Sequence, residues 1–202
     1  TAKHFKLGII VNEYFNDKDF VERLNFYLKY KNLLLLKKDV SDEIISSFSD
    51  RIVFPIHNLQ KEICLFGGRT YLNSEPKYLY SENNDKVSKS LFIYNLENCN
   101  SNKPLIICEG PFDVWALYQN DEKNSAAILG SDFSREQIKQ LMNFNNKIYI
   151  CLDSDKAGKD GVFKLLKNNI GIRKKTLVID IPSNDPYDFY MKDLGKDIKN
   201  YS

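Results

Sequence analysis

Two stretches of the chain decide its fold. Residues 105–113 read LIICEGPFD, and residues 147–158 read KIYICLDSDKAG. Short β-branched runs bounded by glycine or proline are typical of buried strands, and a helix-like stretch follows each of them. Repeated strand–turn–helix units favour an open parallel sheet, in which ligands bind beyond the carboxyl ends of the strands. The carboxylates of Glu109, Asp153 and Asp155 are therefore expected at one edge of the sheet.

These clustered carboxylates predict a metal site. Like charges repel one another unless a proton or a cation lies among them, and hard oxygen ligands favour Mg²⁺ or Mn²⁺. Such a site suits metal-assisted chemistry on phosphates. The alternative is that an acidic residue at a strand end only caps the next helix, as Asp155 and Asp113 are placed to do. The presence of both stretches, in this order and about forty residues apart, favours the metal site.

The second half of the chain alternates between strand-like and helix-like segments. The strand candidates are residues 105–108, 126–129, 147–152 and 175–181. The helix candidates between them are residues 112–119, 134–144 and 157–169, and Ser134 with Gln137 fits a capping box. This alternation predicts a right-handed parallel α/β unit of about ninety residues.

The first half of the chain has a mixed pattern. Residues 51–56 and 62–66 are β-like, and the polar residues between them suit a hairpin connection. Gly67-Gly68 follows at once, which suggests a bulge or a tight bend at a place where another group approaches the backbone closely. Further elements are expected upstream: helices over 17–30 and 41–48, and a strand or helix end over 33–36.

A change of composition at residues 98–103 marks a boundary between the two halves. We expect a small mixed α+β subdomain in residues 1–102, an α/β domain in residues 103–191 and a tail in residues 192–202. The fold class is thus α/β, or α+β when the whole chain is counted, with a parallel sheet flanked by helices.

The composition restricts the function less than the motifs do. Of the 202 residues, 43% are hydrophobic, which is enough for a core. The 29 basic and 27 acidic residues leave a net charge of +2, so any basic surface for nucleic acid must be local. No signal peptide and no apolar run of transmembrane length is apparent, so we expect a soluble protein without a membrane partner.

The cysteines do not suggest a zinc site. The four of them, and the two histidines, lack the spacing of zinc ligands. Cys108 and Cys151 lie inside predicted strands, where buried reduced thiols are expected. We therefore expect no zinc in this chain and a reducing compartment.

Several motifs together resemble a known family. Glu109-Gly110-x-x-Asp113 followed by Asp153-x-Asp155-x-Ala157-Gly158 resembles the signature of a Toprim domain, which occurs in bacterial-type primases, topoisomerases, recombination-mediator proteins and some nucleases. Other segments resemble parts of the DnaG-type DNA primase core: residues 5–8, 51–56, 66–69, 76–79, 129–131 and 185–188. The resemblance extends from about residue 5 to 191.

This resemblance implies a catalytic core that makes short RNA primers from NTPs on single-stranded DNA. It implies two divalent metals, Mg²⁺ or Mn²⁺, that hold the triphosphate and assist attack by a 3′-hydroxyl. The acidic residues that the resemblance assigns to catalysis and metal binding are Glu109, Asp153 and Asp155, with Asp185 as an outer ligand and Asp113 as a further candidate.

The resemblance also implies a basic ridge and a set of partners. Arg69, Lys77 and Lys89 belong to this ridge, with Tyr78 and Lys159 as further candidates for nucleotide or template binding. The implied partners are the single-stranded template, the RNA–DNA hybrid and a replicative helicase, which binds through regions absent from this sequence. The implied location is the bacterial replisome in the cytoplasm. The alternative is that the chain is an organellar or phage-derived relative.

The sequence departs from the family pattern at three positions. Pro111 replaces a usually aromatic residue, but proline suits the first turn of a helix. Ser154 replaces the usual glycine between the two aspartates, and Tyr187 separates the acids of the late motif, which leaves the role of Asp188 open.

Three alternatives differ in what they require of the chain. A topoisomerase has a third acid where Ala157 stands, and needs further large domains. A Toprim nuclease, the runner-up, does not need the Phe-Gly-Gly-Arg segment of residues 66–69. A non-catalytic nucleic-acid-binding module is disfavoured because unpaired buried carboxylates are costly without a purpose.

Overall fold

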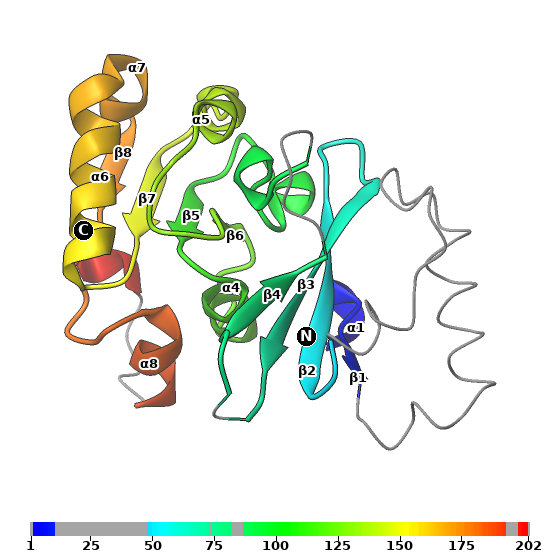
Figure 1. Ribbon diagram of the computed structural model, residues 1–202. Coiled ribbons are helices and arrows are strands. Elements are labelled where there is room, and N and C mark those ends of the chain that lie inside the picture. Colours follow the sequence, from blue (N-terminus) through cyan, green and yellow to red (C-terminus); the bar gives the residue numbers. More distant parts are fainter. Residues whose placement is uncertain (1, 11–47, 73, 82–86, 193–197, 202) are drawn as a thin grey trace. The chain divides into compact units, whose positions relative to one another are not determined.

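The computed structural model describes most of the chain in five stretches: residues 2–10, 48–72, 74–81, 87–192 and 198–201. The chain divides into two compact units, residues 1–89 and 90–202, and each contains its own four-stranded sheet within the described stretches (Figure 1). The elements expected over 17–30, 33–36 and most of 41–48 lie outside the described residues.

An antiparallel sheet forms the N-terminal unit. Its strands follow each other in order, after the short helix α1 (Ala2–Phe5): β1 (Gly8–Ile10), β2 (Arg51–His57), β3 (Ile63–Thr70) and β4 (Tyr78–Tyr80). The predicted β2–β3 hairpin is confirmed. The Asn58 side chain closes its turn by accepting the backbone N–H groups of Gln60 and Glu62, each at 3.0 Å. The pairing register shifts between Ile56 and His57, near the start of β3.

The two glycines of β3 form no bulge or bend, which corrects that prediction, but the close approach to their backbone that was expected with it is confirmed. Gly67 and Gly68 lie within the regular part of β3 and pair with both neighbouring strands. A Cβ atom on Gly67 would collide with the ring of Phe54, which is fully buried, and one on Gly68 would lie 2.6 Å from the ring of Phe48. The glycines therefore make room for aromatic side chains that pack directly on the backbone of the strand.

A parallel sheet forms the centre of the C-terminal unit, as predicted. Its strands lie in the order β6-β5-β7-β8: β5 (Leu105–Cys108), β6 (Ser125–Ala127), β7 (Ile148–Cys151) and β8 (Thr176–Val178). The α-helices that follow are α4 (Pro111–Gln119), α5 (Arg135–Met142), α6 (Lys156–Asn168), α7 (Ile170–Arg173) and α8 (Pro186–Met191). Short 3-10 turns cover Lys89–Leu91, Leu96–Asn98 and Ile198–Tyr201. Helices α5 and α6 contact α7, whereas α4 contacts α8, so the helices form two groups.

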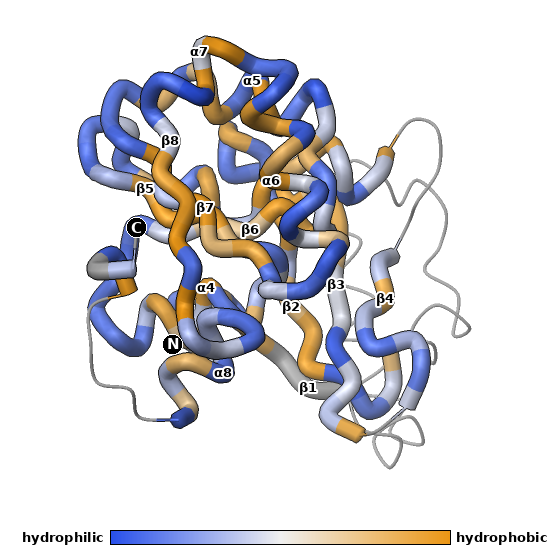
Figure 2. The backbone as a smooth tube through the Cα atoms, turned by 90° about the vertical axis from the view of Figure 1, so that its left-hand side faces the viewer, coloured by the Kyte–Doolittle hydropathy of each residue, from blue (hydrophilic) through white to orange (hydrophobic). Residues whose placement is uncertain are grey.

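The core of this unit lies along β5 and β7. All four residues of β5 are buried, as expected for a parallel strand covered on both faces. Figure 2 shows the apolar character of these central strands, in contrast to the long hydrophilic stretches of the surrounding helices. Cys108 and Cys151 are buried free thiols, as the sequence predicts, and the two residues lie opposite each other in the register of β5 and β7. The carboxyl ends of β5 and β7 therefore lie side by side.

Candidate metal centre and basic surface

The topology of the parallel sheet brings the two acidic motifs together. From β5 the chain passes through α4 to β6 on one side, and then returns to β7 on the other side of β5. Glu109 directly follows β5, and Asp153 lies two residues beyond the end of β7. Both residues thus stand at the point where the connections change direction, which is where open α/β sheets bind their ligands.

Helix α6 is pressed against the loop that carries the second motif. A Cβ atom on Gly158 would collide with the backbone oxygen of Asp153, and one on Gly161 would collide with the backbone oxygen of Ser131. The glycine of the motif is therefore required by close contact between the helix and the acidic loop. A larger side chain at position 158 would have to displace Asp153.

Asp155 and Asp185 cap helices as well as lying near the site. The Asp155 carboxylate accepts the backbone N–H of Gly158 at 2.9 Å, at the start of α6. The Asp185 carboxylate accepts the backbone N–H of Asp188 at 2.6 Å, at the start of α8. The capping interpretation of Asp155 is therefore correct. It is compatible with metal binding, because an ionised carboxylate offers about four acceptor sites.

Asp113 connects the first acidic motif with the late one. Its buried carboxylate accepts the backbone N–H of Gly110 at 3.0 Å and that of Tyr187 at 3.3 Å. Burial raises the pKa of Asp113 to about 7, with a further increase from the neighbouring charges of Asp185 and Asp153, while the two hydrogen bonds lower it. Asp113, Asp153 and Asp185 are thus close enough for their charges to interact.

We refer to these five acids, Glu109, Asp113, Asp153, Asp155 and Asp185, as the acidic edge. Within the described stretches, no group of three or more His, Cys, Asp or Glu side chains is already arranged to hold a metal ion. The donor set nevertheless fits a hard divalent cation, because it consists of carboxylates, and the pKa of Asp113, raised mainly by burial, is raised further by repulsion from Asp185 and Asp153. A cation among them would remove that repulsion.

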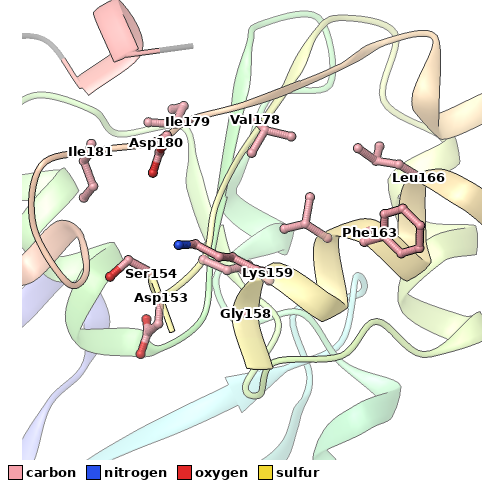
Figure 3. A pocket seen from close by; sticks show the side chains of 12 residues that line it. Asp153, Ser154, Gly158, Lys159, Phe163, Leu166, Val178, Ile179, Asp180 and Ile181 are labelled. Carbon is pink, nitrogen blue, oxygen red and sulfur yellow. The ribbon is translucent and has the colours of Figure 1, made fainter. Parts of the chain in front are cut away.

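Lys159 borders a cavity of about 350 Å³ between α6 and the segment that follows β8. Figure 3 shows its ammonium group at the same end of the cavity as Ser154 and Asp180. The opposite end is apolar and includes Phe163, Leu166 and Val178. Asp153 also lines this cavity, so Lys159, a predicted nucleotide-binding residue, shares the cavity with a predicted metal ligand.

Two of the predicted basic residues of the N-terminal unit, Arg69 and Lys89, contact tyrosine rings. Arg69 and Tyr78 are register partners on β3 and β4, and the Arg69 guanidinium donates to the Tyr78 hydroxyl at 2.7 Å. The same guanidinium lies 5.1 Å from the centre of the Tyr78 ring. The Lys89 ammonium lies 4.9 Å from the centre of the Tyr80 ring, and the two tyrosine rings stack with their centres 6.5 Å apart. Arg69, Tyr78, Tyr80 and Lys89 therefore form a continuous series of contacts, which we call the cation–aromatic row.

Lys77 is exposed and lies just before β4. Its backbone carbonyl accepts the N–H of Thr70 at 3.2 Å and a guanidinium N–H of Arg51 at 3.4 Å. The buried Arg51 also donates to the carbonyl of Pro76 at 2.8 Å, so it fixes the segment that carries Lys77.

Neither Arg51 nor Tyr80 was predicted to be a functional residue. The alternation of Tyr78 and Tyr80 along one strand could have revealed Tyr80, but nothing in the sequence connects Arg51 with residues 76 and 77.

Two sequence families match this chain. Residues 1–100 match the N-terminal domain of the DNA primase catalytic core, and residues 106–190 match the Toprim-like family. A DNA primase of Thermotoga maritima is 34% identical over 176 residues, which make up 83% of this chain and 31% of that protein. The chain spans about a third of the length of the curated relatives it matches.

Solved structures agree with these matches. The E. coli primase catalytic core is 26% identical with a TM-score of 0.68, and the alignment covers 95% of this chain and 64% of that one. A DnaG primase catalytic domain bound to single-stranded DNA shares the fold, with a TM-score of 0.70 at 24% identity over 96% of this chain and 63% of that one.

The matched regions contain all of the predicted site residues. The Toprim-like match includes the acidic edge, and the primase-core match includes the cation–aromatic row. None of the helices in the described part of the chain is long and apolar enough to span a membrane. The chain belongs to the DnaG-type DNA primase family, in which it combines the N-terminal domain of the catalytic core with a Toprim-like domain.

Proposed function

We propose that this chain is the catalytic core of a primase, which makes short RNA primers from NTPs on single-stranded DNA. The observation that carries the proposal is the position of Glu109 and Asp153 at the carboxyl ends of adjacent parallel strands, with Asp113 and Asp185 close by. The functional modules are residues 1–102, which contact nucleic acid, and residues 103–191, which carry the chemistry, with 192–202 as a tail. The matched relatives are bacterial, which supports a place in bacterial DNA replication.

The acidic edge is suited to hold Mg²⁺ or Mn²⁺. Glu109, Asp153 and Asp155 are the proposed ligands and catalytic residues, with Asp185 farther out. When bound, the metal polarises phosphate oxygens and neutralises the charge that develops on them. Asp113 keeps the start of α8 next to the start of α4 through its two hydrogen bonds, and this places Asp185 beside the other acids.

Glu109 has a second proposed role, as acceptor of the proton that leaves the attacking 3′-hydroxyl. Glu109 lies at the end of β5, directly before Gly110. Because glycine has no side chain, a substrate group can approach Glu109 closely. General-base assistance of this kind is worth about 10²–10⁴-fold in rate. This makes Glu109 the residue whose conservative replacement should cost the most activity.

The cation–aromatic row and Lys77 are the proposed contacts to the template and to the RNA–DNA hybrid. Surfaces that bind single strands combine cations, which follow the phosphates, with aromatic rings. One structural relative was solved with single-stranded DNA bound, which supports the same ligand here. Lys159 remains a further candidate for nucleotide binding, beside Asp153 at the cavity of Figure 3. The helicase contact is proposed to lie in a region outside this sequence.

The decisive experiment is primer synthesis by the full-length protein from NTPs on single-stranded DNA. Glu109→Gln should reduce synthesis by about 10²–10⁴-fold while template binding persists, because the substitution removes only the charge. Glu136→Gln, an exposed acid on α5, is the matched control and should retain activity. Near-normal synthesis by Glu109→Gln would contradict the assignment, and shortening of RNA without synthesis would favour the Toprim nuclease alternative.

A further inference from the structure

Tyr80 stands in the middle of the cation–aromatic row. One side of its ring faces Tyr78, with the two ring planes only 14° apart, and the Lys89 ammonium also lies over the Tyr80 ring. Tyr78 in turn contacts Arg69 through both its hydroxyl and its ring. Tyr80 is thus the residue that joins Lys89 to the rest of the row.

The ring of Tyr80 makes these contacts, and its hydroxyl does not. Within the described stretches the Tyr80 hydroxyl has no hydrogen-bond partner, whereas the Tyr78 hydroxyl accepts a hydrogen bond from Arg69. Burial raises the pKa of Tyr80 well above its ordinary value, so this side chain stays neutral at all physiological pH values.

A neutral aromatic partner has a specific consequence for Lys89. An aspartate or glutamate at position 80 would also orient the lysine, but it would bring a negative charge that opposes phosphate binding. The ring attracts the ammonium through its quadrupole and adds no net charge of its own. A lysine held in this way has already given up side-chain freedom before it meets a phosphate, so binding costs it less entropy.

We propose that Tyr80 is a positioning residue for template binding: its ring holds Lys89 and, through Tyr78, connects it to Arg69, so that both cations are presented together to the phosphates of a single strand. This inference rests on the proposed function. It adds a residue that touches no phosphate itself, and a requirement for an aromatic ring at position 80.

The first test measures the affinity of the full-length protein for a single-stranded oligonucleotide at several salt concentrations. Tyr80→Leu should weaken binding by about three- to tenfold at low salt, since a cation over a partly desolvated ring is worth about this much. Tyr80→Phe should preserve binding because it keeps the ring. Tyr71→Leu is the control, because Tyr71 is an exposed tyrosine of the same unit that bonds to Asp50.

The double variant Tyr80→Leu/Lys89→Ala shows whether Tyr80 acts through Lys89. If it does, the double variant should bind no more weakly than Lys89→Ala alone. Additive reductions in affinity, or wild-type binding by Tyr80→Leu, would overturn the inference. Tyr80→Met fills similar space with a flexible side chain, and replaces the leucine variant if that variant does not fold.

A second test needs no nucleic acid and therefore separates this inference from the proposed function. In NMR spectra the ε-methylene protons of Lys89, assigned through their disappearance in Lys89→Ala, should be shifted upfield by the ring. The shift should persist in Tyr80→Phe and vanish in Tyr80→Leu. Ordinary lysine shifts in the wild-type protein would refute the contact, whether or not the protein binds DNA. Failure of the wild type to bind single strands, with the ring shift present, would instead refute the proposed function.

Discussion

In the C-terminal unit, the acidic side chains come from segments that are far apart in the sequence. Asp113 and Tyr187, for example, are 74 residues apart and are joined by a hydrogen bond. In the N-terminal unit, Arg69 and Lys89 are positioned by direct contact with aromatic rings on β4. The acidic edge therefore depends on the topology of its sheet, whereas the cation–aromatic row depends on a few side-chain contacts. Changes in the first region should affect stability and metal binding together, and changes in the second should mainly affect nucleic-acid binding.

The largest expected effect of this difference is on the pH dependence of stability. The pKa of Asp113 rises from 3.8 to about 7 on folding, so the native state keeps a proton that the unfolded chain releases. The resulting stability is present below about pH 4 and is lost as the pH rises towards 7, by an amount on the order of 4 kcal/mol. Asp113→Asn should flatten this dependence, as measured by denaturant unfolding between pH 4 and 8 without divalent cations. Asp160→Asn, an exposed acid on α6, should leave the slope unchanged. An equal slope in the Asp113 variant would show that other groups cause it.

The next effect is stabilisation by metal. Mg²⁺ or Mn²⁺ binds only the folded acidic edge, so at a hundredfold excess over Kd it should add about 2.7 kcal/mol to the stability and raise the melting temperature. Asp153→Asn/Asp155→Asn should abolish most of this rise. The control Asp121→Asn/Asp160→Asn removes two exposed acids. If the melting temperature of the Asp153/Asp155 variant still rises as in the wild type, the metal binds elsewhere.

A pair of glycine variants compares the two regions directly. Gly158→Ala forces a methyl group against the backbone of Asp153, and should cost about 1–3 kcal/mol and weaken metal binding. Gly68→Ala places a methyl group against side chains, the Phe48 ring and Arg51, and not against backbone, so it should cost less than Gly158→Ala and leave metal binding intact. Metal titration and denaturant unfolding of both variants provide the comparison. Tight metal binding by Gly158→Ala would show that the loop tolerates displacement.

The smallest effect concerns salt. Arg69→Ala/Lys77→Ala should weaken single-strand binding and reduce its salt slope by roughly 0.7 for every phosphate that these two side chains neutralise. Lys139→Ala/Lys174→Ala removes two exposed lysines from the C-terminal unit and is the control. Identical slopes for the wild type and the Arg69/Lys77 variant would mean that these residues are ordinary solvated surface.

The parallel sheet could be predicted because its signals are local. Each apolar run is bounded by turn residues, and the expected capping box of Ser134 and Gln137 is present with hydrogen bonds of 3.0 and 3.1 Å. The last strand was predicted too long. Only Thr176–Val178 forms β8, and the chain then leaves the sheet, where the N–H of Asp180 donates to the carbonyl of Tyr201.

The remaining features depend on contacts between distant residues. The packing of Phe54 on Gly67 involves two strands, and a run of two glycines in the sequence looks the same in a strand and in a bend. The residues of the acidic edge could be named from their motifs, but the link between Asp113 and Tyr187 could not, because it depends on how α4 and α8 pack. Their catalytic and metal-binding roles stay predictions for the experiments above.

The contact of α6 with the acidic loop also bears on how this site could be transplanted. Gly158 and Gly161 meet backbone atoms of Asp153 and Ser131, so the shape of the loop is specified partly by the first two turns of the helix. A designer who moved only the two aspartates to another parallel sheet would transfer their charges without their positions. Residues 153–161 include both Gly158 and the Asp153 backbone that it meets, and the receiving scaffold would have to offer a backbone surface for Gly161, whose contact Ser131 lies outside this piece.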